Sequence, residues 1–268
     1  MQYEESQNPS IDTQGYERAK AISTGLCSVD ALIGAGGLPR GHIIEVYGPP
    51  SCGKTTLGLN WIAAAQGRGC NAVLVDAEHS FDAAWASQAG VNSKELVLVQ
   101  PENGEQVRPI LDQLLRTFSV DLVVLDSAAA LNPISGPIVG SDGWQEDPHV
   151  HLLFQLLHRM KWLVQRTQAA FVILNQSRTS GIGENAKPSS AGARALNPYT
   201  SVRIQLNSGP ALKHYPVREL TLRTVKNKFA EPFAQAAVEL WGAKAQLLQR
   251  KPPAVETRHG SVRQSERA

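Results

Sequence analysis

The residues with the clearest chemical meaning form one glycine-rich segment, Gly48-Pro49-Pro50-Ser51-Cys52-Gly53-Lys54-Thr55. It fits the pattern G-x-x-x-x-G-K-[ST] in full, directly after the apolar run IIEVY at 43–47 and at the start of a helix-like stretch that includes Thr56. Glycines let backbone N–H groups point inward at phosphate oxygens, and a helix N-terminus adds partial positive charge. The segment therefore predicts a phosphate-binding loop, with Lys54 on the β- and γ-phosphates of a nucleotide and the Thr55 hydroxyl on Mg²⁺.

Cys52 lies inside this segment at a predicted helix N-terminus, where the pKa of a thiol can fall. Two interpretations stay open: a redox-sensitive thiol that regulates the site, or a small residue that fits a tight loop. With Cys27 and Cys70 the cysteines number three, and no CxxC pair occurs. This count argues against a disulfide framework or a zinc knuckle and indicates a reducing, cytoplasmic environment.

Three further polar residues stand where apolar, strand-like runs end. Asp126 ends DLVVL and is placed to complete a Mg²⁺ shell or, alternatively, to cap the following turn. Glu78 follows AVLV, where it can polarise a water for attack on a γ-phosphate, although a surface glutamate after a strand is also common. Gln176 follows AFVIL, where an amide can sense the γ-phosphate and move the next segment.

The next segment, at about 177–195, is rich in Gly, Ser and Ala and carries Arg178, Lys187 and Arg194. Long segments without periodicity in compact domains are usually functional or disordered. Cations among flexible glycines suit contacts with the backbone of single-stranded nucleic acid. The segment has no aromatic residue on which a base could stack, so a plain mobile loop is the alternative.

The elements that must position these residues alternate along the chain. Short β-rich runs occur at 43–47, 72–75, 96–99, 121–125 and 170–174, and helix-like stretches lie at about 54–66, 81–89, 104–118 and 149–167. Continuous apolar strands that alternate with helices predict an α/β fold with a mostly parallel sheet covered on both faces. Later runs at 200–206, 217–225 and 236–241 have no comparable helices between them and predict an antiparallel extension of this sheet.

The 268 residues are 42% hydrophobic with a net charge of +2, which excludes a wholly disordered chain or a coiled coil. We expect one domain over 21–245 between a flexible acidic segment at 1–20 and a flexible basic tail at 246–268. The tail is either solvated or a non-specific tether to nucleic acid. No apolar run approaches the ~18 residues of a membrane span, and no secretory signal is visible.

Together these residues resemble the bacterial RecA recombinases from about Ala21 to Gly242. The matching stretches are ISTGLCSVDALIGAGGLPRG, EVYGPPSCGKTT, DAEHSFD, the GEQ at 104–106, VLDSAAAL, LNQSR and VKNKFAEPF. The resemblance implies a RecA-like P-loop NTPase core that uses ATP and Mg²⁺. It also implies a DNA-stimulated ATPase that assembles on single-stranded DNA and pairs it with a homologous duplex in DNA repair and the SOS response.

The resemblance implies a role for each candidate in the nucleotide site. Glu78 matches the catalytic carboxylate of the family and acts with Lys54 of the phosphate loop. Asp126 matches the family's metal-side aspartate, and Gln176 matches its γ-phosphate sensor. Asp82 and Trp85 fall where the family holds the adenine, with Trp85 in place of the usual tyrosine. Since a tryptophan ring also stacks on a base, we expect base binding there to survive.

Lys226 and Lys228, in VKNK, match lysines that reach into the nucleotide of the neighbouring subunit. ATP would then bridge protomers, because a ligand that binds the assembled state better shifts the equilibrium toward that state. We therefore expect self-association into an ATP-bridged filament. Without the resemblance, these lysines would be interpreted as a solvated strand face.

The chain also departs from the family pattern. By the resemblance, its N-terminal segment is shorter and a small C-terminal domain is lacking. The segment at about 134–148 matches the first DNA-binding loop only loosely, and His151 and His158 stand where the family carries arginines. In the second loop Gly192 is kept, while the replaced positions are Ala193, Arg194, Asn197 and Pro198. Candidate DNA contacts are Arg178, Lys187, Gly192 and Arg194.

These departures keep two alternatives open beside the recombinase. The first is a RecA-like paralogue, an accessory ATPase that regulates a full-length RecA or serves a repair polymerase without strand exchange of its own. The second is a nucleotide-switched interaction module with little affinity for DNA. The three differ in whether the protein alone forms ATP-dependent filaments on DNA.

Overall fold

The computed structural model describes residues 20–117, 119–134, 136, 138–139, 145–180, 187–209 and 217–247. The expected flexible ends, at 1–20 and 246–268, lie almost wholly outside these ranges, as does most of the segment at 134–148. The described ranges fall between residues 20 and 247, and the domain boundaries at 21 and 245 stay a prediction.

A ten-stranded sheet forms the centre of the molecule, in the order β14-β13-β12-β11-β3-β9-β6-β4-β5, with β10 beside β9. Its parallel part comprises β3 (Ile43–Gly48), β4 (Ala72–Asp76), β5 (Val97–Val99), β6 (Leu122–Asp126), β9 (Ala170–Ser180) and β11 (Val202–Ser208). Its antiparallel strands are β10 (Lys187–Ser190), β12 (Val217–Asn227), β13 (Gln235–Trp241) and β14 (Lys244–Leu247). The predicted α/β fold and mostly parallel sheet are confirmed.

Two small ribbons lie apart from this sheet. One pairs β1 (Ala21–Ile22) with β2 (Leu38–Pro39), and the other pairs β7 (Ile138–Val139) with β8 (Gln145–Glu146).

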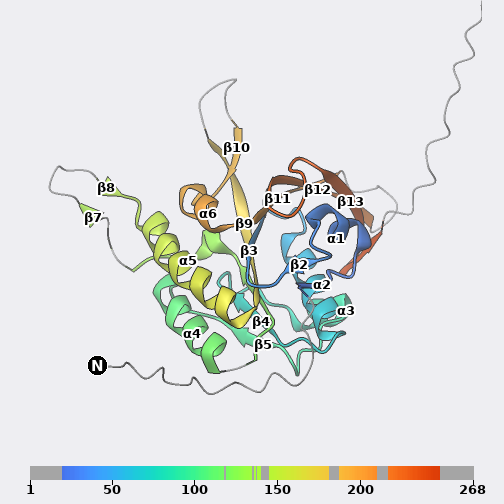
Figure 1. Cartoon of the computed structure of the whole chain (residues 1–268), viewed down its shortest axis with the longest axis horizontal. Coiled ribbons are helices and arrows are strands. Elements are labelled where there is room, and N and C mark those ends of the chain that lie inside the picture. Colours follow the sequence, from blue (N-terminus) through green and yellow to red (C-terminus); the bar gives the residue numbers. More distant parts are fainter. Residues whose placement is uncertain are drawn as a thin grey trace, which may run out of the picture.

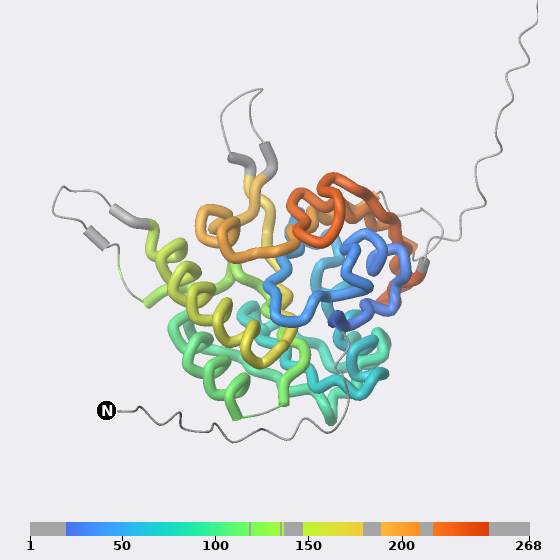
Figure 2. Tube along the Cα trace, viewed as in Figure 1, coloured from blue at the N-terminus to red at the C-terminus, as the bar shows by residue number. Residues whose placement is uncertain are grey.

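Helices cover both faces of the sheet (Figure 1). Those on one side are α1 (Cys27–Ile33), α2 (Lys54–Gln66) and α3 (Ala83–Ala89), and those on the other are α4 (Gly104–Thr117), α5 (Pro148–Thr167) and α6 (Ala193–Tyr199). A short 3₁₀ turn at Ala128–Ala130 follows β6. Figure 2 shows how segments distant in sequence meet, since α1 lies beside β12 and β13 near the other end of the chain.

The two sides of the sheet make two hydrophobic cores because side chains alternate along each strand. In β3, Ile44 and Val46 pack with α1 and α2, whereas Ile43 packs with α4 and α5. All six residues of β3 are buried, and all except Glu45 are uncharged, as expected for a strand covered on both faces. Burial of each large aliphatic side chain contributes roughly 1.5–3 kcal/mol to folding.

The structure differs from the sequence prediction in two places. The run at 200–206 becomes β11, which is parallel to β3, so the antiparallel extension begins only at β12. The segment at 177–195 is not structureless, because β9 continues to Ser180 and pairs with β10, and α6 follows from Ala193. The backbone of 177–180 thus pairs with that of 187–190 in a local ladder that no apolar pattern predicts.

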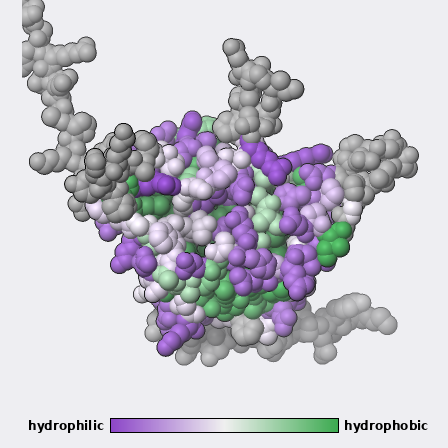
Figure 3. All heavy atoms as spheres, turned by 180° about the vertical axis from the view of Figure 1, so that it is seen from behind, coloured by the Kyte–Doolittle hydropathy of each residue, from purple (hydrophilic) through white to green (hydrophobic). Residues whose placement is uncertain are grey.

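α5 is the longest helix, with 20 residues, and combines a buried leucine face with exposed cationic and aromatic residues. None of the helices in the described ranges is long and apolar enough to cross a membrane. Seen from behind, the described surface is largely hydrophilic, with hydrophobic side chains gathered in its lower part (Figure 3).

Candidate functional site

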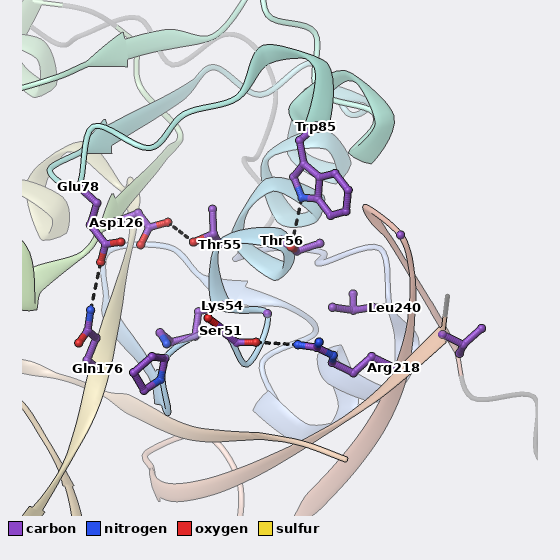
Figure 4. A pocket seen from close by; sticks show the side chains of 14 residues that line it. Ser51, Lys54, Thr55, Thr56, Glu78, Trp85, Asp126, Gln176, Arg218 and Leu240 are labelled. Atoms are coloured by element: carbon purple, nitrogen blue, oxygen red, sulfur yellow. Dashed lines mark hydrogen bonds between the residues drawn. The ribbon is translucent and has the colours of Figure 1, made fainter. Parts of the chain in front are cut away.

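A cavity of about 540 Å³ opens at the carboxyl edge of the parallel strands, above the loop that joins β3 to α2 (Figure 4). Ligands in open α/β sheets bind at this edge, because strand-end loops and helix N-termini meet there. The predicted residues that line the cavity are Pro50, Ser51, Gly53, Lys54, Thr55, Thr56, Glu78, Trp85, Asp126 and Gln176. The fold therefore brings together most of the predicted nucleotide site.

The loop needs glycine at two positions. A Cβ on Gly48 would lie 2.3 Å from the carbonyl oxygen of Leu206, which is backbone and cannot move aside. Gly53 has a φ of +95°, and a Cβ there would lie 2.9 Å from a methyl of Leu240. Ser51 also has a positive φ, of 57°. These constraints give the G-x-x-x-x-G spacing a steric cause and hold the loop in a tight concave turn.

Lys54 points back into this turn. Its side chain is buried, and Nζ donates hydrogen bonds to the carbonyl oxygens of Pro49, at 2.7 Å, and Gly48, at 3.2 Å. A buried ammonium group needs negative charge close by. Lys54, at the first turn of α2, is therefore positioned for an anion held by the loop.

Thr55 and Asp126 meet at the base of the cavity, where Thr55 Oγ1 donates a hydrogen bond of 2.6 Å to Asp126 Oδ2. Burial raises the pKa of Asp126 to about 6; the hydrogen bond from Thr55 opposes this, and the charges of Glu78 and Asp76 add to it. A divalent cation would favour the ionised carboxylate. The hydroxyl and carboxylate are hard oxygen ligands of the kind that Mg²⁺ prefers.

In the described ranges, no three His, Cys, Asp or Glu side chains are placed to hold a metal ion. Mg²⁺ would therefore need phosphate oxygens in addition to Thr55 and Asp126. This arrangement fits a metal that arrives with a nucleotide rather than a resident ion.

Glu78 lies across the cavity from the loop and is fixed by two neighbours. Ser127 Oγ donates to Glu78 Oε1 at 2.5 Å, and Gln176 Nε2 lies 3.5 Å from the same oxygen, a long and weak contact. Gln176 pairs with Gly48 in the sheet, which places it beside the phosphate loop. Glu78 and Gln176, both predicted at strand ends, therefore face the same cavity, and Asp126 lies nearby (Figure 4).

Asp76 holds the turn that carries Glu78, a role that sequence reasoning missed. Its buried carboxylate accepts hydrogen bonds from the backbone N–H of Ser80, at 3.1 Å, and of Phe81, at 2.9 Å, and from Gln100 Nε2 at 3.0 Å. The sequence signal that could have revealed this role is an aspartate at the end of a strand-like run, followed by a turn. Aspartate readily accepts hydrogen bonds from nearby backbone N–H groups.

Of the two described residues expected to hold the base, Trp85 lines the cavity and Asp82 does not. Trp85 lines the cavity, and its Nε1 lies 3.3 Å from Thr56 Oγ1. Asp82 is not among the described residues that line the cavity; it caps α3 by accepting from the backbone N–H of Ala84, at 2.8 Å, and of Trp85, at 3.0 Å. In this structure Asp82 thus orients the helix that presents Trp85.

Four lining residues were missed, and they belong to the antiparallel strands and the turn after them: Val217, Arg218, Leu240 and Gly242. Arg218 Nη1 donates a hydrogen bond of 2.6 Å to the carbonyl oxygen of Ser51 in the phosphate loop. All four residues are distant from the phosphate loop in the sequence, and only the order of strands in the sheet brings β12 and β13 beside this loop. Nothing in the local pattern signals this proximity.

Cys52 is buried behind the loop, with 2% of its surface exposed. Burial raises the pKa of its thiol, although Lys54, with Nζ 3.8 Å from Sγ, opposes the rise. A reactive cysteine needs the opposite, a lowered pKa and an accessible sulfur. The structure therefore favours the interpretation of Cys52 as a small packing residue.

Lys226 lies at the far end of β12 from Arg218, about 26 Å along the strand, and Lys228 directly follows that end. Lys226 Nζ donates to the carbonyl oxygen of Asn197 in α6. Partial burial lowers the pKa of Lys226, and the charges of Lys228, Arg203 and Lys161 lower it further. Neither lysine is among the described residues that line the cavity of its own chain.

The candidate DNA contacts are spread over three elements, β9, β10 and α6. Arg178 is exposed on β9, and Arg194 is exposed on α6. Lys187 pairs with Ser180 through the backbone, but its side chain lies outside the described residues. Gly192 has a φ of +63°, and a Cβ there would lie 2.3 Å from a methyl of Leu153. The glycine is therefore required by packing against α5, whatever it contacts outside.

Residues 9–245 match the family described as the RecA N-terminal domain. Similar curated proteins include Protein RecA of Halalkalibacterium halodurans, 38% identical over 86% of this chain and 67% of the relative. Protein RecA of Thioalkalivibrio sulfidiphilus is 39% identical over 85% of this chain and 68% of the relative. A crystal structure of the RadB recombinase aligns with a TM-score of 0.65 at 23% identity, over 85% of this chain and 100% of that one, which shows a common fold.

Proposed function

Because this chain belongs to the RecA family, we propose that it hydrolyses ATP and acts as a recombinase on single-stranded DNA. In this proposal it promotes homologous pairing and strand exchange during DNA repair. The observation that carries the proposal is the cavity in which Lys54, the Thr55–Asp126 pair and Glu78 surround one space. These are the groups needed to hold a nucleoside triphosphate and a water at its γ-phosphate.

ATP binding begins with the loop between β3 and α2. Its backbone N–H groups and the N-terminus of α2 bind the phosphates, and Lys54 exchanges the carbonyl oxygens of Gly48 and Pro49 for phosphate oxygens. Trp85 offers its ring to the base. Arg218 would add a cation on the opposite wall of the cavity.

Thr55 and Asp126 are the residues that would hold Mg²⁺, and Thr55 already donates to Asp126. When bound, the metal neutralises charge on the β- and γ-phosphate oxygens. In the nucleotide-free protein, burial raises the pKa of the Asp126 carboxyl to about 6. A bound Mg²⁺ would favour the ionised carboxylate and so lower this pKa.

Glu78 is the candidate base in hydrolysis. Its carboxylate, held by Ser127, would accept a hydrogen bond from the attacking water and aim it at the γ-phosphorus. The oxygen of water forms the new P–O bond, the bond to the β-phosphate oxygen breaks, and ADP leaves with the electron pair. Gln176, beside both Glu78 and Gly48, would detect the presence of the γ-phosphate.

The position of Lys226 and Lys228 supports a role between subunits. They lie far from the cavity of their own chain, so they are available to the nucleotide of a neighbour. Partial burial, with repulsion from Lys228 and other cations, already lowers the pKa of Lys226, and a phosphate would relieve that cost. ATP would then favour the assembled state over the free protomer and bridge a filament.

The test is ATP hydrolysis with and without single-stranded DNA, at about 50 and about 200 mM salt. We expect stimulation by DNA that weakens at the higher salt concentration, and ATP-dependent strand exchange between a single strand and a homologous duplex. Lys54→Ala serves as the inactive reference. Hydrolysis by Lys54→Ala at the wild-type rate would contradict the assignment of the site.

A second candidate is an accessory RecA-like ATPase without strand exchange of its own, acting on a full-length RecA or a repair polymerase. The specific observation in its favour is that His151 and His158 on α5 replace the arginines implied by the resemblance. Hydrolysis indifferent to DNA, together with no strand exchange, would favour this candidate. ATP-dependent partner binding with a weak salt dependence for DNA would favour a nucleotide-switched module instead.

A further inference from the structure

Arg218 is a cation at the end of a buried face of β12. Side chains two residues apart on a strand lie on one face, so Arg218 shares its face with Leu220 and Leu222, which are fully buried. Leu240 of β13 pairs with Arg218 in the strand register and is also buried. Because arginine is rarely buried in a hydrophobic core, its guanidinium group must reach beyond this row, and it does so into the cavity (Figure 4).

The phosphate loop packs directly against the strand face from which Arg218 projects. A Cβ on Gly53 would lie 2.9 Å from a methyl of Leu240 and 3.5 Å from two methyls of Leu220. This close packing keeps the guanidinium group beside the loop, where Nη1 donates a hydrogen bond of 2.6 Å to the carbonyl oxygen of Ser51. The position of Arg218 relative to the loop is therefore set by the hydrophobic core beneath it.

Among the described residues that line the cavity, the two cations are Lys54 and Arg218, and both contact carbonyl oxygens of the loop. Lys54 donates to Gly48 and Pro49, and Arg218 donates to Ser51. None of the ion pairs between described residues includes Arg218. A neutral carbonyl oxygen is a weaker partner for a guanidinium group than an anionic oxygen is. An anion in the cavity would therefore compete for Arg218 as it does for Lys54.

The two ends of the cavity differ in chemistry. Glu78 and Gln176 lie at one end and Trp85 and Arg218 at the other, with Lys54 between them (Figure 4). A nucleotide with its γ-phosphate at Glu78 and its base at Trp85 runs along this line. Its α-phosphate, the one next to the sugar and base, then falls at the end of the cavity that holds Arg218.

We propose that Arg218 binds the α-phosphate of the nucleotide and exchanges the carbonyl oxygen of Ser51 for a phosphate oxygen. This inference rests on the proposed function, since it concerns the same nucleotide site. A guanidinium group suits the role because its planar fork matches two phosphate oxygens. ATP and ADP share the α-phosphate, so the contact stabilises substrate and product equally. Arg218 thus tightens nucleotide binding and slows release of ADP without accelerating the chemical step.

The test is the Kd for Mg²⁺–ADP and for a non-hydrolysable ATP analogue, measured by isothermal titration calorimetry on the whole chain. We expect Arg218→Ala to weaken both by the same factor, roughly 10- to 100-fold. Arg218→Lys keeps the cation and should recover part of the affinity. The matched control is Arg223→Ala, because Arg223 is exposed on the same strand and its guanidinium carbon lies 5.6 Å from the ring centroid of Phe233.

Arg218→Gln separates a phosphate contact from simple support of the loop. The glutamine amide can still donate to the carbonyl oxygen of Ser51, but it carries no charge. We expect Arg218→Gln to bind ADP as weakly as Arg218→Ala, with a smaller dependence of the Kd on salt than the wild type shows. Wild-type affinity in Arg218→Gln would mean that Arg218 only holds the loop, and it would overturn the inference.

Two further outcomes count against the inference. Weaker binding of the ATP analogue with unchanged binding of ADP would place the contact on the γ-phosphate instead. Equal affinities of wild type and Arg218→Ala for both nucleotides would remove Arg218 from the site while leaving the proposed function intact. By contrast, a wild-type protein that binds neither nucleotide would contradict the proposed function itself.

Discussion

Gln176 Nε2 lies 3.5 Å from Glu78 Oε1, so the candidate γ-phosphate sensor and the candidate base contact each other across the cavity. Gln176 also belongs to the base of the β9–β10 hairpin, because its carbonyl oxygen accepts from the backbone N–H of Ala191 at 2.9 Å. Asn175 Nδ2 strengthens this junction by donating to the carbonyl oxygen of Ala191 at 2.7 Å. A change at the phosphate site can therefore reach the hairpin through one residue.

Replacing Glu78 with glutamine should separate ATP binding from hydrolysis. The amide keeps the shape and can still contact Ser127, but it cannot accept a proton from water as a carboxylate does. We expect hydrolysis to fall about 10²- to 10⁴-fold while the Kd for ATP stays within about threefold. Single-turnover hydrolysis and equilibrium binding measure the two quantities. Glu95→Gln, at an exposed turn, is the matched control, and unchanged turnover in Glu78→Gln would require another base.

Removing the Gln176 amide should uncouple the nucleotide from DNA. If the contact with Glu78 transmits the state of the γ-phosphate to the hairpin, Gln176→Ala leaves ATP binding but breaks the link. We expect the ATP-dependent gain in affinity for single-stranded DNA, on the order of 5- to 150-fold in the wild type, to shrink toward one. Gln88→Ala, exposed on α3, is the control. A full ATP response in Gln176→Ala would place the coupling elsewhere.

Asp126 should make the nucleotide-free protein less stable as the pH rises. Its pKa is about 6 in the folded protein against 3.8 for an unperturbed aspartate, so the folded state holds the proton more tightly. The stabilisation is complete below pH 3.8 and is lost as the pH rises through about 6. The difference between these two pKa values corresponds to about 3 kcal/mol of stability.

Urea unfolding with EDTA at pH 4.5, 5.5 and 7 measures this effect against Asp126→Asn, which still accepts from Thr55 but does not titrate. Other groups titrate in both proteins, so the difference between them isolates this carboxyl. We expect wild type to lose stability relative to Asp126→Asn across this range. A constant difference would mean that the Asp126 carboxyl is ionised throughout.

The features that could be predicted from the sequence are those that depend on neighbouring residues. The G-x-x-x-x-G-K-[ST] spacing and the buried runs at 43–47 and 170–174 correctly placed the loop, α2 and the central strands. Sequence reasoning missed Arg218 and Leu240, and the parallel pairing of β11 with β3, because strand order depends on contacts between distant segments. It also missed the hairpin after Gln176, whose polar ladder has no hydrophobic period.

Arg203 should be one of the costliest polar residues to remove, because it neutralises a carboxylate in the core. Its Nε donates to Glu45 Oε2 at 2.5 Å, and Glu45 is fully buried in β3. The same guanidinium donates to Ser190 Oγ at 2.9 Å and to Asn197 Oδ1, which joins β10 and α6 to the sheet. Arg203→Met would leave Glu45 with its charge uncompensated, apart from the hydrogen bond from Asn175.

We expect Arg203→Met to lower the free energy of unfolding by about 3–5 kcal/mol in urea denaturation followed by circular dichroism. Arg116→Ala breaks an exposed ion pair with Asp112 and should cost less than about 1 kcal/mol. Adding Glu45→Gln to Arg203→Met should recover part of the loss, because the buried charge is removed while an acceptor for Asn175 remains. No recovery in the double variant would mean that the loss comes from the contacts with Ser190 and Asn197 rather than from the buried charge.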